Sequence, residues 1–393
     1  MKKILLLSIF PSCFFSVLSL LFLYTWYDEL PNDDIIITYS FDIFITTFFF
    51  IIFIFSNTSF FQRVTPKINS DLVIFISTKL CFSIAILGLV TYSIVAIQFT
   101  KQLHELGPVI AIAEYREYGE NYGTLLLKRL IQLMFIVSIF SKFISKKLTV
   151  SLFVCVCLIA YCGFSRTDVA ILVYFATIYL AFFYPENPRK ILFYFLIFVL
   201  IAITSSALIS IYQARQSDII SAIKHVLEKI FVYRIYAIYL ADNLQQESVY
   251  ISTYLFSFVG FIGERILILL NIEDIRYVVD TGFVSKFQYI KNGNHANALY
   301  PWWAWFYLTF GIFGIIIKNI FSFFIYWIIC KIRFPMLFLY FSYLLLYGQF
   351  QRHIFLTAND FYQLLGLILF DLIFILFIKK RVKYDSQRNN TNI

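Results

Sequence analysis

The sequence contains a series of apolar runs, each of about 20 residues, separated by polar segments. A helix of that length rises about 30 Å at 1.5 Å per residue, which matches the hydrocarbon thickness of a bilayer. Of the 393 residues, 61% are hydrophobic and 14% are charged, whereas an average soluble domain is about 25% charged. No soluble core could bury that much apolar surface. We therefore expect an all-α, polytopic integral membrane protein.

About ten transmembrane helices are predicted from these runs. They are expected at 4–25, 35–55, 72–98, 124–144, 148–162, 169–184, 191–211, 301–329, 335–348 and 361–378. The chain then divides into seven helices within 1–211, a large periplasmic loop at 212–300, three helices within 301–378 and a basic cytoplasmic tail at 379–393. The first run follows Lys2 and Lys3 without a small-residue cleavage site, so we expect it to be retained. No inverted repeat is visible in the sequence.

The formal net charge of +9 is distributed by side of the membrane. With a cytoplasmic N-terminus, every cytoplasmic segment is basic, as the positive-inside rule requires, and both termini are expected in the cytoplasm. Only Asp71, Glu186 and Asp385 oppose this charge. The basic residues on that side are Lys2, Lys3, Arg63, Lys67, Lys142, Lys146, Lys147, Arg189, Lys190, Lys331, Arg333, Lys379, Lys380, Arg381, Lys383 and Arg388. The positive charge therefore indicates membrane topology and not nucleic-acid binding.

The long loop at 212–300 contains two segments with helical character. Residues 219–231 have apolar side chains at helical spacing, which predicts an amphipathic helix on the membrane surface. Residues 251–270 are apolar but contain Gly260, Gly263 and the pair Glu264-Arg265. A span here would also place the basic C-terminus outside. We therefore expect an interfacial or re-entrant helix.

The cysteines and the charges within the spans are few. Cys155, Cys157 and Cys162 are not spaced for two thiolates to share a helix face, so neither a metal site nor a disulfide framework is expected. Asp42 and Lys79 lie deep enough in their predicted spans to pair between helices. The other charges, which lie nearer to span ends where long side chains can reach the interface, are Lys128, Arg129, Lys318 and Asp371.

Arginines collect on the predicted outer face, where the planar guanidinium fork matches phosphate oxygens. They are Arg166, Arg215, Arg234, Arg265, Arg276 and Arg352. A single loop arginine more often contacts a lipid headgroup or forms an ion pair. Arg166 has a stronger case for function because it lies in a very short turn between two spans, with pairing to Asp168 as the alternative.

Two outer-face residues are candidates for proton transfer. His295 lies just before a span that opens with Tyr300, Pro301, Trp302 and Trp303, and imidazole titrates near neutral pH. A lone loop histidine is usually incidental, and His225 and His353 are the other histidines on the predicted outer face. Glu264 stands in an apolar helix, where a charge is costly and marks a functional hypothesis by default, although an ion pair is the alternative. The tryptophans at 302, 303 and 305 are typical of an interfacial aromatic belt, with a sugar-stacking platform as the second interpretation.

The order of these features resembles the O-antigen polymerase and O-antigen ligase superfamily. The resemblance rests on Ser165-Arg166 opening a span, on Arg215 and Arg234 in a long loop, and on His295 leading into a span. The histidine is followed by Asn297 and Leu299, and the span carries Gly311-Ile312-Phe313-Gly314. The resemblance covers about residues 150–330. Ala296 stands where the ligases usually have Asn, and the stretch from His295 to Gly311 is longer than in ligases, which favours a polymerase.

This resemblance implies transfer of a growing glycan from undecaprenyl diphosphate onto a new lipid-linked repeat unit at the periplasmic face of the bacterial inner membrane. The enzyme would be an inverting glycosyltransferase that needs no metal or cofactor. Arginines would stabilise the diphosphate leaving group, and His295, with Glu264 in reserve, would deprotonate the acceptor hydroxyl. Membrane lipids and a chain-length regulator protein are further candidate partners, and no nucleic acid is expected.

Three other interpretations stay open. An O-antigen ligase shares the chemistry. A flippase or other transporter of lipid-linked oligosaccharides would have internal symmetry, charges deep in its spans and short loops. A structural subunit would not depend on any one outer-face arginine.

Overall fold

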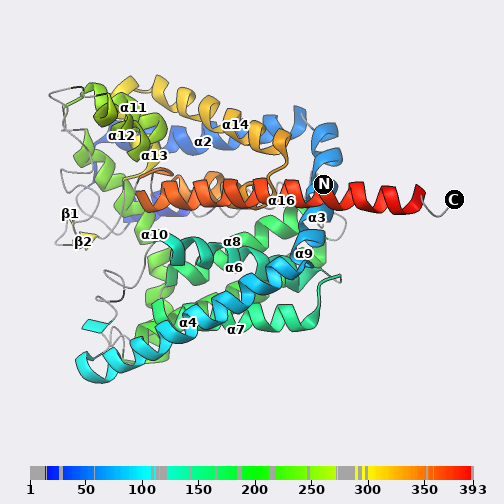
Figure 1. The fold of residues 1–393 in the computed structure, drawn as a ribbon. Coiled ribbons are helices and arrows are strands. Elements are labelled where there is room, and N and C mark those ends of the chain that lie inside the picture. Colours follow the sequence, from blue (N-terminus) through cyan, green and yellow to red (C-terminus); the bar gives the residue numbers. More distant parts are fainter. Residues whose placement is uncertain are drawn as a thin grey trace. The chain divides into compact units, whose positions relative to one another are not determined.

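The computed structural model describes residue 14 and residues 16–25, 30–56, 58–107, 110–111, 115, 122–141, 143–163, 166–183, 188–212, 217–245, 248–270, 272, 288–290, 294–296, 300–350, 353–356 and 358–390. Within them the secondary structure is helical apart from one short antiparallel ribbon (Figure 1). The chain folds into two compact units. Unit 1 comprises Met1–Ser59, Ile223–Ile328 and Phe341–Phe361, and unit 2 comprises Phe60–Ala222, Ile329–Tyr340 and Tyr362–Ile393.

Five helices of the described residues are long and apolar enough to cross a membrane. They cover Asp33–Phe53, Lys79–Leu106, Gly123–Phe140, Phe313–Ile332 and Ala358–Leu376. Shorter apolar helices cover Ser16–Thr25, Asp168–Phe183, Leu196–Ile211 and Pro335–Gly348. The chain is therefore an α-helical membrane protein, which confirms the predicted class. The count of about ten spans and the side on which each loop lies stay predictions.

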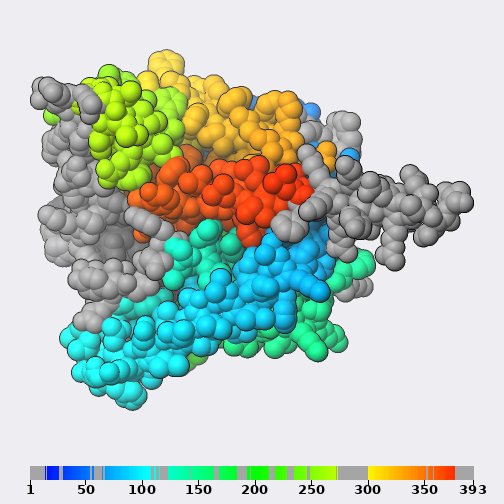
Figure 2. Space-filling view, viewed as in Figure 1, coloured from blue at the N-terminus to red at the C-terminus, as the bar shows by residue number. Residues whose placement is uncertain are grey.

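Helix α4 (Lys79–Leu106) has the surface expected of a helix in lipid. One face is buried in unit 2 through Cys81, Ala85, Gly88, Tyr92, Ala96 and Phe99. The opposite face exposes Phe82, Ile86, Val90, Ile94 and Ile97 at helical spacing, and Figure 2 shows α4 uncovered along its length. Because the exposed face is as apolar as the buried one, lipid and not water is its natural surrounding.

Unit 2 is built from α4, α6 (Tyr122–Phe140), α7 (Lys146–Gly163), α8 (Arg166–Phe183), α9 (Pro188–Tyr212) and most of α3 (Thr58–Ile76) and α16 (Ala358–Asn390). Small residues allow α4 to approach its neighbours closely: a Cβ on Gly88 would lie 2.5 Å from Cδ1 of Ile131 in α6. The prediction of one span at 72–98 is wrong, because the helix breaks at Ser77 and Thr78. Ser77 Oγ donates to the Ile74 carbonyl at 2.6 Å and Thr78 is extended.

Unit 1 contains α2 (Asp33–Ser56), α10 (Ile219–Leu244) from Ile223 onward, and the segments that follow α10. The backbone N–H of Ser221 donates to Asp218 Oδ1 at 2.8 Å, which caps α10 and holds the pKa of Asp218 below its usual range. The predicted helix at 219–231 is confirmed, and its place on the membrane surface stays a prediction. The helix continues beyond the predicted segment to Leu244, and residues 234–241 are all buried.

A broken-helix motif occurs twice in unit 1. In the first copy, α11 (Ile251–Val259) is followed by Gly260 and α12 (Phe261–Leu269). In the second, α13 (Trp302–Phe310) is followed by Gly311 and α14 (Phe313–Ile332). The first helix has nine residues in both copies, and the two glycines have φ of 53° and 61°, a backbone region that favours glycine. The prediction of one continuous span at 301–329 is therefore wrong.

The second glycine of each motif is required by close packing. A Cβ on Gly263 would lie 2.9 Å from Leu255 Cβ, and a Cβ on Gly314 would lie 2.1 Å from the Phe306 carbonyl oxygen. In both copies the contact is with the residue eight positions earlier, on the preceding short helix. Each Gly-x-x-Gly sequence therefore turns the chain at its first glycine and packs two helices together at its second.

The two copies pack antiparallel through α11 and α13. Tyr254 contacts Phe310 at 5.3 Å between ring centroids, and Phe258 contacts Phe306 at 4.9 Å. As the residue number rises along α11, the number of its partner falls along α13, so these two helices run antiparallel. Little besides the glycines is shared between them, which explains why no repeat is visible in the sequence.

Alanine substitutions at two glycines should separate close packing from backbone strain. Gly314→Ala places a Cβ against backbone and should lower the free energy of unfolding by about 3 kcal/mol. At Gly311 nothing lies within 4 Å of the Cβ position, so Gly311→Ala adds only the backbone strain of an alanine at positive φ. It should lower the free energy of unfolding by about 1 kcal/mol. Thermal unfolding of the purified variants measures both. Equal losses would contradict the assignment of Gly314 to helix packing.

Helix α15 (Pro335–Tyr343) begins with a cap supplied from another helix. Phe334 precedes it and has no polar side chain, so Asp371 of α16 accepts the backbone N–H groups of Met336 at 3.1 Å and Leu337 at 2.9 Å. Asp371 is fully buried, so the prediction that its charge reaches the interface from a helix end is wrong. The predicted span at 335–348 ends as a π-helical turn over Leu344–Gly348.

Candidate functional site

At the break between α11 and α12, a carbonyl group from another segment accepts a backbone hydrogen bond. The Phe355 carbonyl accepts the backbone N–H of Phe261 at 2.9 Å. A Cβ on Gly260 would lie 2.0 Å from that same oxygen. The sequence predicted a re-entrant or interfacial helix here because of its glycines and charges. The structure shows a helix interrupted at Gly260, and its interfacial or re-entrant position stays a prediction.

The two charges after this break face different surroundings. Glu264 lies in the first turn of α12 and is 2% exposed, where the positive end of the helix dipole favours a carboxylate. Arg265 is exposed, and its guanidinium carbon lies 4.8 Å above the ring centre of Phe261. Glu264 is thus a buried acid in the core of unit 1, and Arg265 is a surface cation beside it in sequence.

A buried histidine supports the break. Nδ1 of His353 accepts the backbone N–H of Phe355 at 2.9 Å, so the ring hydrogen belongs to Nε2, which lies 3.2 Å from the Ser257 carbonyl oxygen. The same carbonyl accepts Nε1 of Trp302 at 2.9 Å. Both ring nitrogens of His353 are therefore committed to backbone groups, and the residue positions the hairpin. No pattern in the sequence distinguished this histidine from an incidental one.

The three tryptophans of α13 lie in the core of unit 1. Trp302 and Trp303 have no exposed surface and Trp305 is 2% exposed. Trp305 packs on Phe256 at 4.6 Å and on Tyr300 at 5.9 Å between ring centroids. The prediction of an interfacial belt is wrong for these residues, because side chains enclosed by protein cannot contact headgroups.

Arg234 is the predicted binding residue that the structure places most clearly. It lies in the second half of α10, is fully buried, and acts electrostatically on the Tyr39 hydroxyl of α2. Its helix neighbours Ile235 and Ile238 belong to an apolar cluster of unit 1. A guanidinium at such a position requires acceptors around it, because burial of an unpaired charge is very costly.

The other predicted site residues are placed only in part. His295 lies on strand β2 (Asn294–Ala296), opposite Tyr289 of β1 (Gln288–Ile290), and not in a loop as predicted. Arg166 is the first residue of α8. The side chains of His295 and Arg166 lie outside the described part, as do Arg215, Arg276 and Arg352 altogether. The structure brings Glu264 and Arg234 into unit 1.

Sequence reasoning missed a buried charge cluster in unit 2. Asp168 accepts Lys128 Nζ at 3.2 Å and Arg129 Nη1 at 3.1 Å. Arg129 also donates to Gln132 at 2.7 Å. All three charged side chains are at most 12% exposed. Lys128 and Arg129 thus point into the protein and not toward the interface, and Asp168 has these two partners whatever Arg166 does.

Asp168→Asn should therefore lower the free energy of unfolding by about 2–3 kcal/mol, because two buried cations would lose their charged acceptor. The matched control is Glu105→Gln, which removes an exposed carboxylate paired with Lys101 at 3.8 Å and should change stability by less than about 1 kcal/mol. Thermal unfolding of both purified variants decides. A wild-type midpoint for Asp168→Asn would show that the cluster does not stabilise unit 2.

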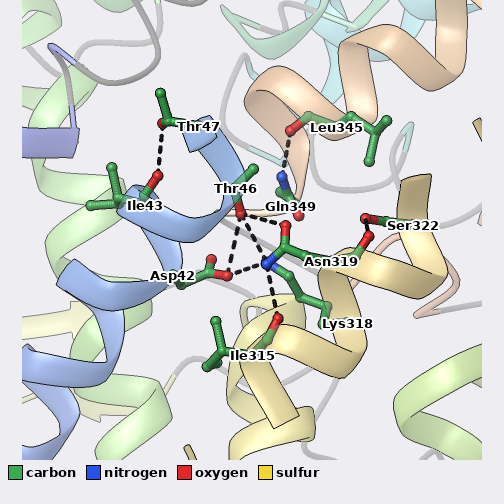
Figure 3. A network of polar contacts seen from close by, with 10 residues as sticks. All are labelled: Asp42, Ile43, Thr46, Thr47, Ile315, Lys318, Asn319, Ser322, Leu345 and Gln349. Atoms are coloured by element: carbon green, nitrogen blue, oxygen red, sulfur yellow. Dashed lines mark hydrogen bonds and ion pairs between the residues drawn. The ribbon is translucent and has the colours of Figure 1, made fainter. Parts of the chain in front are cut away.

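A second buried charge pair joins two candidate spans within unit 1. Lys318 of α14 donates to Asp42 of α2, and neither side chain has exposed surface (Figure 3). Lys318 Nζ also lies 3.4 Å from Thr46 Oγ1, which donates to Asn319 Oδ1 at 2.9 Å. The prediction that Lys79 pairs with Asp42 is wrong: Lys79 is exposed at the start of α4. The prediction that Lys318 reaches the interface is also wrong.

Comparison with protein-family models, with curated proteins and with solved structures gives no match for this chain.

Proposed function

We propose that this chain is a membrane glycosyltransferase of the O-antigen polymerase type. The observation that carries the proposal is the burial of Glu264 and Arg234 within unit 1, both contributed by the segment between α9 and α13. A carboxylate and a guanidinium in an apolar, water-poor surrounding are the two groups that transfer from a lipid diphosphate requires, a base and a stabiliser of the leaving group.

In the proposed reaction, the acceptor hydroxyl of a new lipid-linked repeat unit attacks the anomeric carbon of the growing glycan. The bond from that carbon to the diphosphate oxygen breaks, and the carrier leaves as undecaprenyl diphosphate. Glu264 or His295 takes the hydroxyl proton. Arginine forks at Arg234, and at the five further candidates Arg166, Arg215, Arg265, Arg276 and Arg352, bind the phosphate oxygens of the two lipid substrates.

The proposal is tested by the glycan pattern of a strain that lacks this gene. A polymerase defect leaves lipid A core carrying single repeat units, and the intact gene restores the ladder. Full-length polymer that stays unattached would identify a ligase instead. Accumulation of lipid-linked units in the cytoplasmic leaflet would identify a transporter.

Arg166→Ala and Arg215→Ala should each abolish long chains in that strain at unchanged protein level in the membrane. A lost diphosphate contact removes charge stabilisation worth about 100-fold or more in rate. The measurement is the ladder of the complemented strain, with Lys224→Ala on the exposed face of α10 as the matched control. Normal chain lengths in both arginine variants would remove these residues from the proposed site.

Transport of a lipid-linked oligosaccharide is the second candidate function, and two observations favour it. The Asp42–Lys318 pair is a charge pair buried within candidate spans, and α11–α12 and α13–α14 are two glycine-broken helices whose first halves pack antiparallel. Both features are typical of secondary transporters. Movement of a lipid-linked repeat unit across a vesicle membrane without elongation would decide for transport.

A further inference from the structure

The interruption between α11 and α12 removes one helical hydrogen bond, and residues 353–356, here called the strap, supply new partners for both of its groups. In a continuous helix the backbone N–H of Phe261 would donate to the carbonyl of Ser257, four residues earlier. In the structure that N–H donates to the Phe355 carbonyl at 2.9 Å, and the Ser257 carbonyl accepts Nε2 of His353 at 3.2 Å. His353 and Phe355 thus each take one end of the missing bond.

The start of the strap is fixed by backbone groups and not by the imidazole ring. The N–H of His353 donates to the Tyr300 carbonyl at 2.9 Å. Just before the strap, the Gln349 carbonyl accepts the N–H of Trp302 at 3.1 Å. These two bonds attach the beginning of the strap to the start of α13, so this attachment does not depend on the protonation state of any side chain.

The contact of Phe355 with the break does depend on a side chain. The N–H of Phe355 donates to Nδ1 of His353 at 2.9 Å, and its carbonyl accepts the N–H of Phe261. Because Nε2 faces a carbonyl oxygen, which can only accept, the one hydrogen of a neutral ring is on Nε2 and Nδ1 is an acceptor. A proton on Nδ1 would set two donors against each other. The docked position of Phe355 therefore requires a neutral imidazole.

Gly260 allows the break to respond when Phe355 leaves. Its φ is 53°, and a Cβ at this position would lie 2.0 Å from the Phe355 carbonyl oxygen. Glycine adopts helical φ values about as readily as positive ones. If the strap releases the break, Gly260 can become helical and the N–H of Phe261 can return to the Ser257 carbonyl. The released state therefore does not leave this donor unpaired, which would be costly.

Aromatic rings surround the imidazole of His353. The nearest centroids are those of Phe256 at 5.1 Å, Trp302 at 5.7 Å and Phe355 at 6.3 Å. Glu264, in the first turn of α12, is the carboxyl group that follows the break, so it is the alternative source of a pH effect there. The titratable and charged residues on the segments around the ring are Tyr254, Glu264, Arg265, Tyr300, Tyr307, Tyr347, Arg352 and Asp360.

We propose that His353 is a proton-sensitive latch on the break between α11 and α12. The neutral ring keeps Phe355 docked, and protonation at Nδ1 releases it while the start of the strap stays attached to α13. Lower pH favours the released state, because the released ring accepts a proton that the docked ring cannot hold. Release frees α12 to pivot at Gly260. The inference does not depend on the proposed function.

Hydrogen exchange of the wild-type protein in lipid nanodiscs tests the latch, when it is resolved to single amides and corrected for the intrinsic pH dependence of exchange. An imidazole in the released state takes up its proton at about pH 6.5, so protection of the Phe355 amide should fall about 30-fold between pH 8 and pH 5. The amide of His353, bonded to the Tyr300 carbonyl, should keep constant protection. Constant protection at Phe355, or an equal loss at both amides, would overturn the latch.

His353→Asn identifies the group that takes the proton. An asparagine side chain accepts the backbone N–H two residues later, so it can hold Phe355 without a titratable ring. Protection of the Phe355 amide should then be the same at both pH values. The matched control His104→Asn, at an exposed position of α4, should keep the wild-type response. A pH-dependent loss that persists in His353→Asn would assign the proton to another group, such as Glu264, and would overturn the proposal. The contrast between the two amides in the wild-type protein decides even if this variant does not fold.

Discussion

Lys318→Met should lower the free energy of unfolding by about 3–5 kcal/mol, because it leaves a buried carboxylate without its cation. Asp42 has no exposed surface, and the remaining neighbours Thr46 and Asn319 carry no charge. The loss is read from thermal unfolding in detergent, followed by tryptophan fluorescence. Trp302, Trp303 and Trp305 are buried in unit 1 and report its unfolding.

The double variant Asp42→Leu/Lys318→Met separates pairing from packing. Replacement of a buried ion pair by apolar residues is often neutral or stabilising, so this variant should unfold near the wild-type temperature and well above Lys318→Met. If Lys318→Met alone unfolds like wild type, the pair does not stabilise unit 1. A double variant as unstable as the single one would show that side-chain packing at this position, and not charge, is what matters.

Glu264→Gln should lower the rate of chain elongation at least about 100-fold. An amide of the same shape cannot take the proton from the acceptor hydroxyl. Elongation is measured as polymer formed per enzyme in membranes of equal protein content. The matched control is again Glu105→Gln, an exposed change of the same type on α4, which should elongate at the wild-type rate.

A stability measurement accompanies this prediction, since Glu264 is buried in α12. A variant that keeps its unfolding temperature but makes no polymer supports a chemical role. Loss of activity together with loss of fold would assign Glu264 to structure. Wild-type elongation by Glu264→Gln would remove it from the reaction and leave His295 as the base to test.

The sequence predicted the class of fold because helix length and hydropathy are local properties. It did not predict where helices break. The break at Ser77 and Thr78 and the one at Gly311 both lie inside apolar runs that read as continuous. In the second case the reason is a contact between Gly314 and Phe306 that exists only after folding. At 251–270 the glycines and the pair Glu264-Arg265 marked the helix as unusual, but the sequence did not place a break at Gly260.

The ion pairs could not be predicted from the sequence, because their prediction requires knowing which helices are neighbours. Asp42 and Lys318 are 276 positions apart, so no spacing rule connects them. The same holds for Asp371 and the start of α15. Arg234 was selected for its charge and its place in the long segment, and its complete burial could not be read from a helix whose first half is amphipathic. The side chains of His295 and Arg166, on which much of the resemblance rests, lie outside the described residues.

Reconstitution of the purified protein with an undecaprenyl-diphosphate-linked repeat unit tests the central claim most directly. Liposomes that contain only this protein and the lipid-linked repeat unit should form chains of two and more repeats and release undecaprenyl diphosphate, one for each linkage. Glu264→Gln liposomes should form none. Repeat units that stay single in wild-type liposomes, with or without movement across the membrane, would contradict the assignment as a polymerase.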